Sequence, residues 1–366
     1  MPPPRPSIAF YAPLKSPDHP VPSGDRLMAR QLRAALGTDV DLVSELRSYL
    51  RDPQDATAAG AIEAKAEAEL ARISALWEKS GPPALWVSYH PYYKAPDLLG
   101  PELCARFGVA YVTVESSLST RRNVGLWMQA QDRVRAGLAM AALNICLTRR
   151  DQAGLHEACG TAATAMLSPF IDTAPFSCAD PLPQSGRLIC VAMMRTGDKM
   201  ESYDFLASAL QLISDLPWRL SVIGDGEARA AVHALFASMA DRVDWLGSLG
   251  TEDIAKHLAR AAIYVWPGCG EAYGLAYLEA QAAGLPVVAQ RVAGVPEVVT
   301  HDQSGLLTDA GDLPSYAAAI QRLLTCDNLR HEMAQKARAH VLEHHSQLSA
   351  EARLSKLLAP ILGATQ

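Results

Sequence analysis

Residues 267–286 read PGCGEAYGLAYLEAQAAGLP and join a glycine-bearing loop to the start of a helix. An apolar strand pattern ends at Trp266, and the residues after it predict a helix from Gly274 to Ala283 that Gly284 terminates. The first N–H groups of a helix lack intrahelical partners and carry a partial positive charge, which suits an anion such as a diphosphate. The stretch therefore predicts an α/β domain with a site for a phosphorylated ligand.

Two carboxylates lie in this stretch, Glu271 in the loop and Glu279 within the helix. At about 100° per helical residue, their spacing leaves the side chains roughly 80° apart, so both can face one ligand. A carboxylate accepts hydrogen bonds from vicinal hydroxyls, so that one could hold a ribose and the other a sugar ring. The simpler alternative is a pair of solvated charges near a helix start. The glycine loop and the spacing together favour the functional interpretation.

Short apolar runs alternate with helical patterns along the whole chain, which predicts mostly parallel sheets covered by helices on both faces. We expect strands at 8–11, 40–42, 85–88, 110–114, 145–147, 165–167, 188–193, 219–223, 243–246, 263–266, 286–289 and 305–308. Helices are expected at 26–36, 61–79, 202–212, 228–240, 251–261, 274–283, 295–299, 313–325 and 328–344.

The chain has 366 residues, more than a single hydrophobic core usually serves, which favours two domains. The segment 176–185 is rich in proline and small polar residues and is the predicted linker. We expect one domain over 1–178 and a second over 179–350. Two doubly wound domains joined in this way would form a cleft between the carboxyl ends of their strands.

Composition narrows the classes of partner. The formal net charge is −6, which argues against a nucleic-acid partner. The seven cysteines are scattered without a CxxC spacing, which predicts neither a disulfide framework nor a zinc site and fits a reducing cytosol. The start resembles no secretory signal, and no run approaches the roughly 18 apolar residues of a membrane span. His344 and His345 are interpreted as solvated residues at a helix end.

Glu271 and Glu279, with seven residues between them, resemble the E-x7-E element of retaining family 4 glycosyltransferases of GT-B fold. The resemblance continues in GLPVVA at 284–289, GVPEVV at 294–299, SGLL at 304–307, LSVIGDGE at 220–227 and VDWLG at 243–247. It covers roughly residues 187–350 and is weaker before residue 165. It implies two Rossmann-like doubly wound domains with a cleft between them. The domain over 1–178 would bind the acceptor and the domain over 179–350 the nucleotide sugar, and a last helix over 351–366 would pack back on the first domain.

The resemblance also implies roles for the residues of the glycine loop. Glu279 would bind the ribose hydroxyls of the nucleotide, and Glu271 would contact the donor sugar near its anomeric carbon. The backbone amides of Ala272, Gly274 and Leu275 would hold the diphosphate.

A pair of cations, Arg195 and Lys199, follows the predicted strand at 188–193. Two cations there can balance a leaving diphosphate, which otherwise requires a metal, so we expect no metal and no other cofactor. The resembled family has an arginine and a lysine after this strand, but here Arg195 falls later and closer to Lys199 than usual. The alternative is two exposed loop charges.

In the first half, the resemblance places the family's glycine-containing loop at 20–30, with Gly24 as the donor-binding position. After the strand at 110–114 the family often has a histidine that touches the donor sugar, whereas this chain has Glu115. That carboxylate would bind sugar hydroxyls differently or bind a cationic acceptor group. His90 follows the strand at 85–88 and is either an acceptor contact or a satisfied structural histidine.

These observations predict a cytoplasmic glycosyltransferase, free or at the inner face of the membrane. It would move a hexosyl group from a nucleoside diphosphate sugar to a hydroxyl of a surface polysaccharide, a lipid-linked sugar or a metabolite. Retention of the anomeric configuration is what the resemblance implies. The alternative is a non-catalytic sugar-nucleotide-binding partner subunit of GT-B fold, which Glu115 and the shifted Arg195 favour. The base, the sugar, the acceptor and the oligomeric state stay open.

Overall fold

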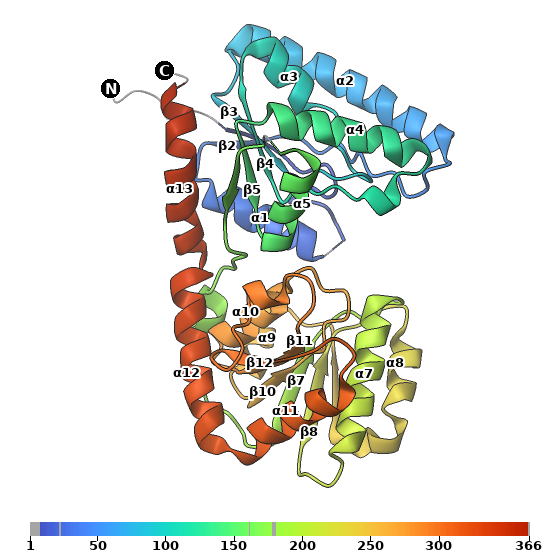
Figure 1. Cartoon of the computed structure of the whole chain (residues 1–366), viewed down its shortest axis with the longest axis vertical. Coiled ribbons are helices and arrows are strands. Elements are labelled where there is room, and N and C mark those ends of the chain that lie inside the picture. Colours follow the sequence, from blue (N-terminus) through green and yellow to red (C-terminus); the bar gives the residue numbers. More distant parts are fainter. Residues whose placement is uncertain (1–7, 22, 161, 178–180, 365–366) are drawn as a thin grey trace. The chain divides into compact units, whose positions relative to one another are not determined.

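The computed structural model describes residues 8–21, 23–160, 162–177 and 181–364 (Figure 1). The chain divides into two compact units, unit 1 with Met1–Leu167 and Ala350–Gln366, and unit 2 with Ser168–Ser349. Of the linker predicted at 176–185, residues 178–180 lie outside the described part of the chain. The residues before them form a short helix, α6 (Ala174–Ser177).

Unit 1 is built on a six-stranded parallel sheet in the order β2-β1-β3-β4-β5-β6. Its strands are β1 (Ile8–Tyr11), β2 (Val40–Ser44), β3 (Leu85–Tyr89), β4 (Ala110–Val114), β5 (Leu143–Cys146) and β6 (Thr164–Met166). Its first helices are α1 (Gly24–Ala35), α2 (Ala56–Ser80), α3 (Gly100–Phe107), α4 (Gly125–Met140) and α5 (Arg149–Ala158). Figure 1 shows α2, α3 and α4 on one side of this sheet and α1 on the other.

A side-chain cap fixes the start of α1 in unit 1. The Ser23 side chain caps α1 by accepting a hydrogen bond from the N–H of Arg26 at 3.3 Å. The cap places the first turn of α1, which carries Asp25, directly after the loop that follows β1. Trp77 of α2 packs edge-to-face on Trp86 of β3, and both belong to one apolar cluster.

Unit 2 has a second six-stranded parallel sheet, in the order β12-β11-β10-β7-β8-β9. Its strands are β7 (Arg187–Val191), β8 (Arg219–Ile223), β9 (Val243–Gly247), β10 (Ile263–Val265), β11 (Val287–Gln290) and β12 (Gly305–Thr308). Its main helices are α7 (Asp198–Leu212), α8 (Arg229–Leu235), α9 (Thr251–Leu258), α10 (Leu275–Ala282), α11 (Leu313–Thr325) and α12 (Asp327–His344). Helix α7 packs against α8 and α11, and α10 packs against α12.

The predicted strands are confirmed to within a few residues, and so is the alternation of strands and helices. Two predicted helices are wrong in detail. The helix expected at 228–240 is α8 followed by a 3-10 segment, Ala237–Arg242, because Met239 departs from helical geometry at φ −134°. The helix expected at 295–299 is a single 3-10 turn, Val295–Glu297.

The interpretation of His345 as a solvated residue is also wrong. Its side chain is only 2% exposed, and its Nδ1 lies 2.6 Å from the carbonyl oxygen of Pro169. The N–H of Ile171 in turn donates to the His345 carbonyl at 2.9 Å. Burial lowers the pKa of His345 to about 4, so the ring is neutral and joins the end of α12 to the start of unit 2.

The last helix, α13 (Gln347–Ala364), begins within unit 2 and continues into unit 1 from Ala350 onward. Leu354 and Leu358 are buried there, at 1% and 3% exposure. Arg353 donates from its Nε to the carbonyl oxygen of Met166 at 3.2 Å. The helix therefore contributes apolar and polar contacts to unit 1.

Candidate functional site

The loop between β10 and α10 depends on its glycines. Gly268, Gly270 and Gly274 all have left-handed backbone angles, with φ of 75°, 72° and 80°. A Cβ at Gly268 would lie 2.2 Å from the Tyr277 hydroxyl oxygen, and one at Gly270 would lie 2.2 Å from Asp198 Oδ2. The loop can therefore approach its neighbours and a ligand only with glycine at these positions.

Helix α10 starts where the sequence predicts it. Gly274 is its N-cap residue, and among the described residues no side chain caps this helix start. Gly284 follows the last turn with φ 84° and donates its N–H to the Gln281 carbonyl at 2.9 Å. The backbone amides of Gly274 and Leu275 thus lie at a helix start of the kind that can bind an anionic group.

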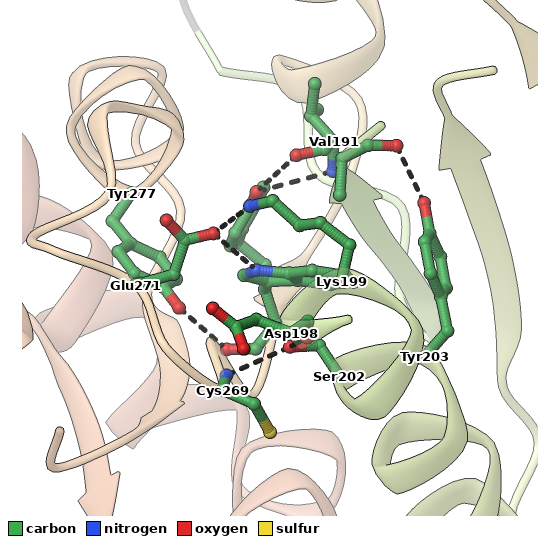
Figure 2. Close-up of polar contacts among 11 residues, drawn as sticks. Val191, Asp198, Lys199, Ser202, Tyr203, Cys269, Glu271 and Tyr277 are labelled. Carbon is green, nitrogen blue, oxygen red and sulfur yellow. Dashed lines mark hydrogen bonds and ion pairs between the residues drawn. The ribbon is translucent and has the colours of Figure 1, made fainter. Parts of the chain in front are cut away.

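Lys199 and Glu271 meet beside this loop (Figure 2). Lys199 comes from the first turn of α7, and its Nζ donates to Glu271 Oε1. The Trp266 indole Nε1–H donates to the same oxygen at 3.2 Å, and Lys199 Nζ lies 5.4 Å from the centre of the Trp266 ring. The side chains of Lys199 and Glu271 keep 28% and 19% of their surface exposed, so the pair is reachable by a ligand.

Three further hydrogen bonds support the loop. Ser202 Oγ accepts from the N–H of Cys269 at 2.9 Å and donates to the Asp198 carbonyl at 2.8 Å. Tyr277 donates its hydroxyl to the carbonyl oxygen of Trp266 at 3.1 Å. Figure 2 shows the first link between α7 and the loop.

Sequence reasoning missed Trp266 and Ser202. The signal available for Trp266 was an aromatic residue with an N–H group directly after β10. Where that N–H points depends on the geometry of the loop. Ser202 lies inside a helical pattern in which serine carries no distinctive signal.

Glu279 lies within α10 and is partly exposed. Burial raises the pKa of its carboxyl to about 7. Within the described part of the chain, its side chain forms no hydrogen bond or ion pair. The carboxylate is therefore available to accept hydrogen bonds from ligand hydroxyls.

The other two residues predicted for the donor site, Arg195 and Gly24, lie apart from the Lys199–Glu271 pair in their contacts. Arg195 lies in the loop between β7 and α7, partly exposed, and its side chain forms no ion pair with any described residue. Gly24 is the first residue of α1, and a Cβ there would meet no atom within 4 Å. Arg195 is therefore not joined to the Lys199–Glu271 pair, and packing in unit 1 does not require glycine at position 24.

A second polar cluster lies in unit 1, at the carboxyl ends of β3 and β4. His90 directly follows β3, and its Nδ1 lies 3.3 Å from Asp25 Oδ1 of α1. Glu115 directly follows β4, is 8% exposed and hydrogen-bonds with Tyr89. Sequence analysis singled out His90 and Glu115 separately, and the structure brings them together with Asp25.

Burial and charge compete in this cluster. Burial lowers the pKa of His90, but the carboxylates of Glu115 and Asp25 outweigh burial and raise it to about 9. Burial raises the pKa of Glu115 to about 7, although the His90 charge opposes that shift. At neutral pH the cluster therefore holds an imidazolium between carboxyl groups.

Three further features of the described residues bear on the chemistry of the chain. No three His, Cys, Asp or Glu side chains gather where they could hold a metal ion. The described cysteines, Cys104, Cys146, Cys159, Cys190, Cys269 and Cys326, are free thiols. None of the described helices has the length and apolar character that crossing a bilayer requires.

Two parallel six-stranded sheets flanked by helices make the fold GT-B, which confirms the predicted fold class. The chain is similar to sucrose-phosphate synthase from Thermosynechococcus elongatus, with a TM-score of 0.74, 20% identity, and 98% and 100% of the two chains covered. It is also similar to the Anabaena protein HepE in complex with UDP, with a TM-score of 0.73, 15% identity, and 97% and 100% coverage.

Residues 185–326, which lie in unit 2, match the family described as "Glycosyl transferases group 1". Among curated proteins, the chain is 32% identical to an exopolysaccharide phosphotransferase of Streptomyces coelicolor over 53% of this chain and 21% of that one. It is 39% identical to a D-inositol 3-phosphate glycosyltransferase of Corynebacterium jeikeium over 30% of this chain and 26% of that one. These matches span well under half of each curated relative.

Proposed function

We propose that the chain is a metal-independent glycosyltransferase that moves a hexosyl group from a nucleoside diphosphate sugar to a hydroxyl acceptor, with retention of configuration. The observation that carries the proposal is the Lys199–Glu271 pair beside the uncapped start of α10. A cation, a carboxylate and open helix amides are the groups that a sugar diphosphate needs. The group 1 domain over 185–326 supports the same function.

Each group has a defined task in this reaction. The amides of Ala272, Gly274 and Leu275 bind the diphosphate, and Glu279 accepts hydrogen bonds from the ribose hydroxyls. Lys199 stabilises the negative charge that grows on the diphosphate as its bond to the sugar breaks. Glu271 orients the sugar at its anomeric carbon.

The acceptor hydroxyl attacks the anomeric carbon, and its proton leaves with the departing diphosphate. We assign the acceptor to unit 1, where His90 and Glu115 contact it or the donor sugar. A cytoplasmic location, at the inner face of the membrane for a lipid-linked or polysaccharide acceptor, completes the proposal.

The first test is turnover of UDP-, GDP- and ADP-sugars by the purified chain and by Lys199→Ala and Glu271→Ala. We expect one donor to be cleaved or transferred, and each substitution to lower that rate by about a hundredfold or more. Lys256→Ala is the matched control, because Lys256 is exposed and its ion pair among the described residues is with Asp253, far from the Lys199–Glu271 pair in sequence. Full activity of both site variants would overturn the assignment of the donor site.

A second candidate function is a non-catalytic sugar-nucleotide-binding partner subunit of a GT-B enzyme. The observation in its favour is that Arg195, the second expected cation, forms no ion pair with any described residue and does not join the Lys199–Glu271 pair. A sugar nucleotide that binds to the chain but is never turned over, with any candidate acceptor, would support this function.

A further inference from the structure

A recess opens in unit 1 between α2, α4 and the loops that follow β2 and β3, with about 430 Å³ of empty space that is partly open to solvent. Three charged residues line it, namely Glu63 of α2, Lys94 of the loop after β3, and Arg133 of α4. Arg133 donates to the Glu63 carboxylate, so these two charges balance each other. Lys94 forms no ion pair or side-chain hydrogen bond with any described residue. The recess therefore carries one unbalanced positive charge.

Aromatic rings and backbone contacts hold Lys94 in a defined position. Its Nζ lies 4.8 Å from the centre of the Trp127 ring and 5.9 Å from that of the Tyr93 ring, and the faces of such rings attract a cation. The N–H of Leu50 donates to the Lys94 carbonyl at 2.7 Å, and the Trp127 indole N–H donates to the Leu50 carbonyl at 3.0 Å. The ammonium group is therefore placed in advance of any ligand, which limits the entropy that binding costs.

Two arginines add positive charge beside Lys94. Burial lowers the pKa of the Lys94 ammonium, and the charges of Arg122 and Arg51 lower it further. Both guanidinium groups are exposed, and neither forms an ion pair or a side-chain hydrogen bond within the described part of the chain. Three cations thus lie near one another with no carboxylate partner among the described residues. Their mutual repulsion disfavours this arrangement, and a bound anion would stabilise it.

The three cations lie at the edge of the sheet where ligands bind. Arg51 follows β2, Lys94 follows β3 and Arg122 follows β4. The carboxyl ends of parallel strands meet at one edge, and open α/β sheets bind their ligands there. The N–H of Leu126, in the first turn of α4, donates to the Pro53 carbonyl at 2.9 Å, which joins the loop that carries Arg51 to the helix that follows Arg122.

We propose that Arg51, Lys94 and Arg122 form a binding site for a phosphate group. Each guanidinium offers pairs of N–H donors whose geometry matches two phosphate oxygens, and the lysine adds a point charge. A phosphate monoester carries about 1.5 to 2 negative charges at neutral pH, more than a carboxylate, so it suits three cations. The assignment of this phosphate to the acceptor rests on the proposed function, and it makes the acceptor a phosphorylated compound.

The phosphate has two sources, a soluble phosphorylated sugar or the headgroup of a phospholipid. Both place an apolar group beside a phosphate, either the carbon-bearing face of a sugar ring or a hydrocarbon chain. The recess that Lys94 lines accepts either one, because its wall also contains the apolar side chains of Leu50, Ile62, Leu98 and Leu126. The shared chemistry is the phosphate, and the test separates the two sources.

The test measures the equilibrium binding of inorganic phosphate, glucose 6-phosphate and glucose by calorimetry. It also measures flotation of the chain with vesicles of phosphatidylcholine, with and without phosphatidylglycerol. The full chain is compared with Lys94→Gln and Arg122→Gln. Arg106→Gln is the matched control, because Arg106 is an exposed arginine of α3 in the same unit that already pairs with Glu78. Each measurement is repeated in a Lys199→Ala background, which removes the cation of the proposed donor site.

We expect glucose 6-phosphate or the anionic vesicles to bind, in the Lys199→Ala background as well. Lys94→Gln and Arg122→Gln should each weaken binding of that ligand and of inorganic phosphate by about tenfold or more, and Arg106→Gln should leave it unchanged. Binding of glucose 6-phosphate but not of glucose identifies a soluble acceptor, and binding that requires phosphatidylglycerol identifies a lipid headgroup. Because Arg122 is exposed, its substitution keeps the test valid even if Lys94→Gln does not fold.

Equal binding by the wild type and Arg122→Gln would overturn the proposal. So would the absence of binding by inorganic phosphate, glucose 6-phosphate and the anionic vesicles alike. None of these measurements uses a sugar nucleotide, so a failure of the phosphate site is distinct from a failure of the proposed function, which shows as no turnover of any donor. A chain that binds phosphate through Arg122 but turns over no donor keeps the site and loses only its assignment to the acceptor.

Discussion

In the proposed donor site, we expect Glu279 to set the pH range in which a nucleotide binds. Its pKa is raised to about 7, so below that pH the free site holds a neutral carboxyl. Ribose hydroxyls that donate to the group favour its ionised form, so binding should lower the pKa and release a proton. We expect nucleotide affinity to rise with pH through about 7, with proton release at pH 6.5 that disappears by pH 8.5. Calorimetry in buffers of different ionisation enthalpy measures this release.

Glu279→Gln is the control for that prediction, because it removes the titrating carboxyl group and keeps a side chain of the same shape. The folded pKa lies above the unfolded value, so the stability contributed by protonation is present at low pH and is lost as pH rises through about 7. The free energy of unfolding of Glu279→Gln, measured relative to that of the wild type, should therefore be higher at pH 8 than at pH 5. Proton uptake on nucleotide binding would contradict a carboxylate that accepts ribose hydrogen bonds.

Trp266 is the residue on which the geometry of Glu271 depends. Trp266→Phe removes the indole N–H that donates to Glu271 Oε1 and keeps an aromatic ring beside Lys199. A hydrogen bond to a charged group contributes about 1.5–3 kcal/mol, so we expect binding or turnover of the nucleotide sugar to weaken by roughly ten- to a hundredfold. Affinity for the nucleoside diphosphate alone should not change.

Trp245→Phe is the matched control, because Trp245 is a partly exposed tryptophan of unit 2. It stacks on His233 with 3.9 Å between the ring centres. The substitution is also made in a Glu271→Ala background. If Trp266 acts through Glu271, its removal has no further effect there. Equal losses in both backgrounds would mean that Trp266 acts on the fold instead.

The loop between β10 and α10 is the element on which the donor site stands, and Gly268 tests its packing. Gly268→Ala adds a left-handed strain at φ 75° and a Cβ that would lie 2.2 Å from the Tyr277 hydroxyl oxygen. Gly247→Ala is the matched control, because Gly247 has φ 69° and a Cβ there would meet no atom within 4 Å. We expect the control to lose about 1 kcal/mol of stability and Gly268→Ala to lose more, together with nucleotide binding. Urea denaturation and nucleotide titration measure both, and equal effects would show that the contact with Tyr277 is unimportant.

At the level of elements, the sequence predicts the strands and the start of α10 because those signals are local. Apolar runs mark the strands, and Gly274 marks the change from loop to helix. The kink at Met239 and the burial of His345 follow from tertiary packing, which no local pattern contains. Asp25, likewise, enters the unit 1 cluster only because β1 and β3 are neighbours in the sheet, and its sequence context is that of a surface charge.

For the whole chain, α13 is the segment that belongs to both units. Ending the chain after Ser349 removes Leu354 and Leu358 from unit 1. Each buried leucine contributes about 2–5 kcal/mol, so unit 1 should unfold at a clearly lower temperature while unit 2 changes little. Calorimetry measures the two transitions. A chain ending after Ala359 keeps both leucines and is the control, and identical unfolding of the two truncated chains would contradict this role of α13.

Strand order also places the two candidate sites. In unit 2 the order reverses between β7 and β10, and Lys199 and Glu271 follow those two strands. In unit 1 it reverses between β1 and β3, and Asp25 and His90 follow those. Ligands of open α/β sheets bind at such points, so strand order alone indicates where each site lies. The sequence then gives the side chains that lie at these two points.

His90 and Glu115 have left-handed backbone angles, with φ of 58° and 57°, and this strain bears on how the sequence can evolve. Glycine at positions 90 and 115 would relieve the backbone strain and remove two groups that are costly to bury. A mutant library selected only for heat resistance should therefore lose His90 and Glu115 early. A lineage that retains both must be under selection for what they bind.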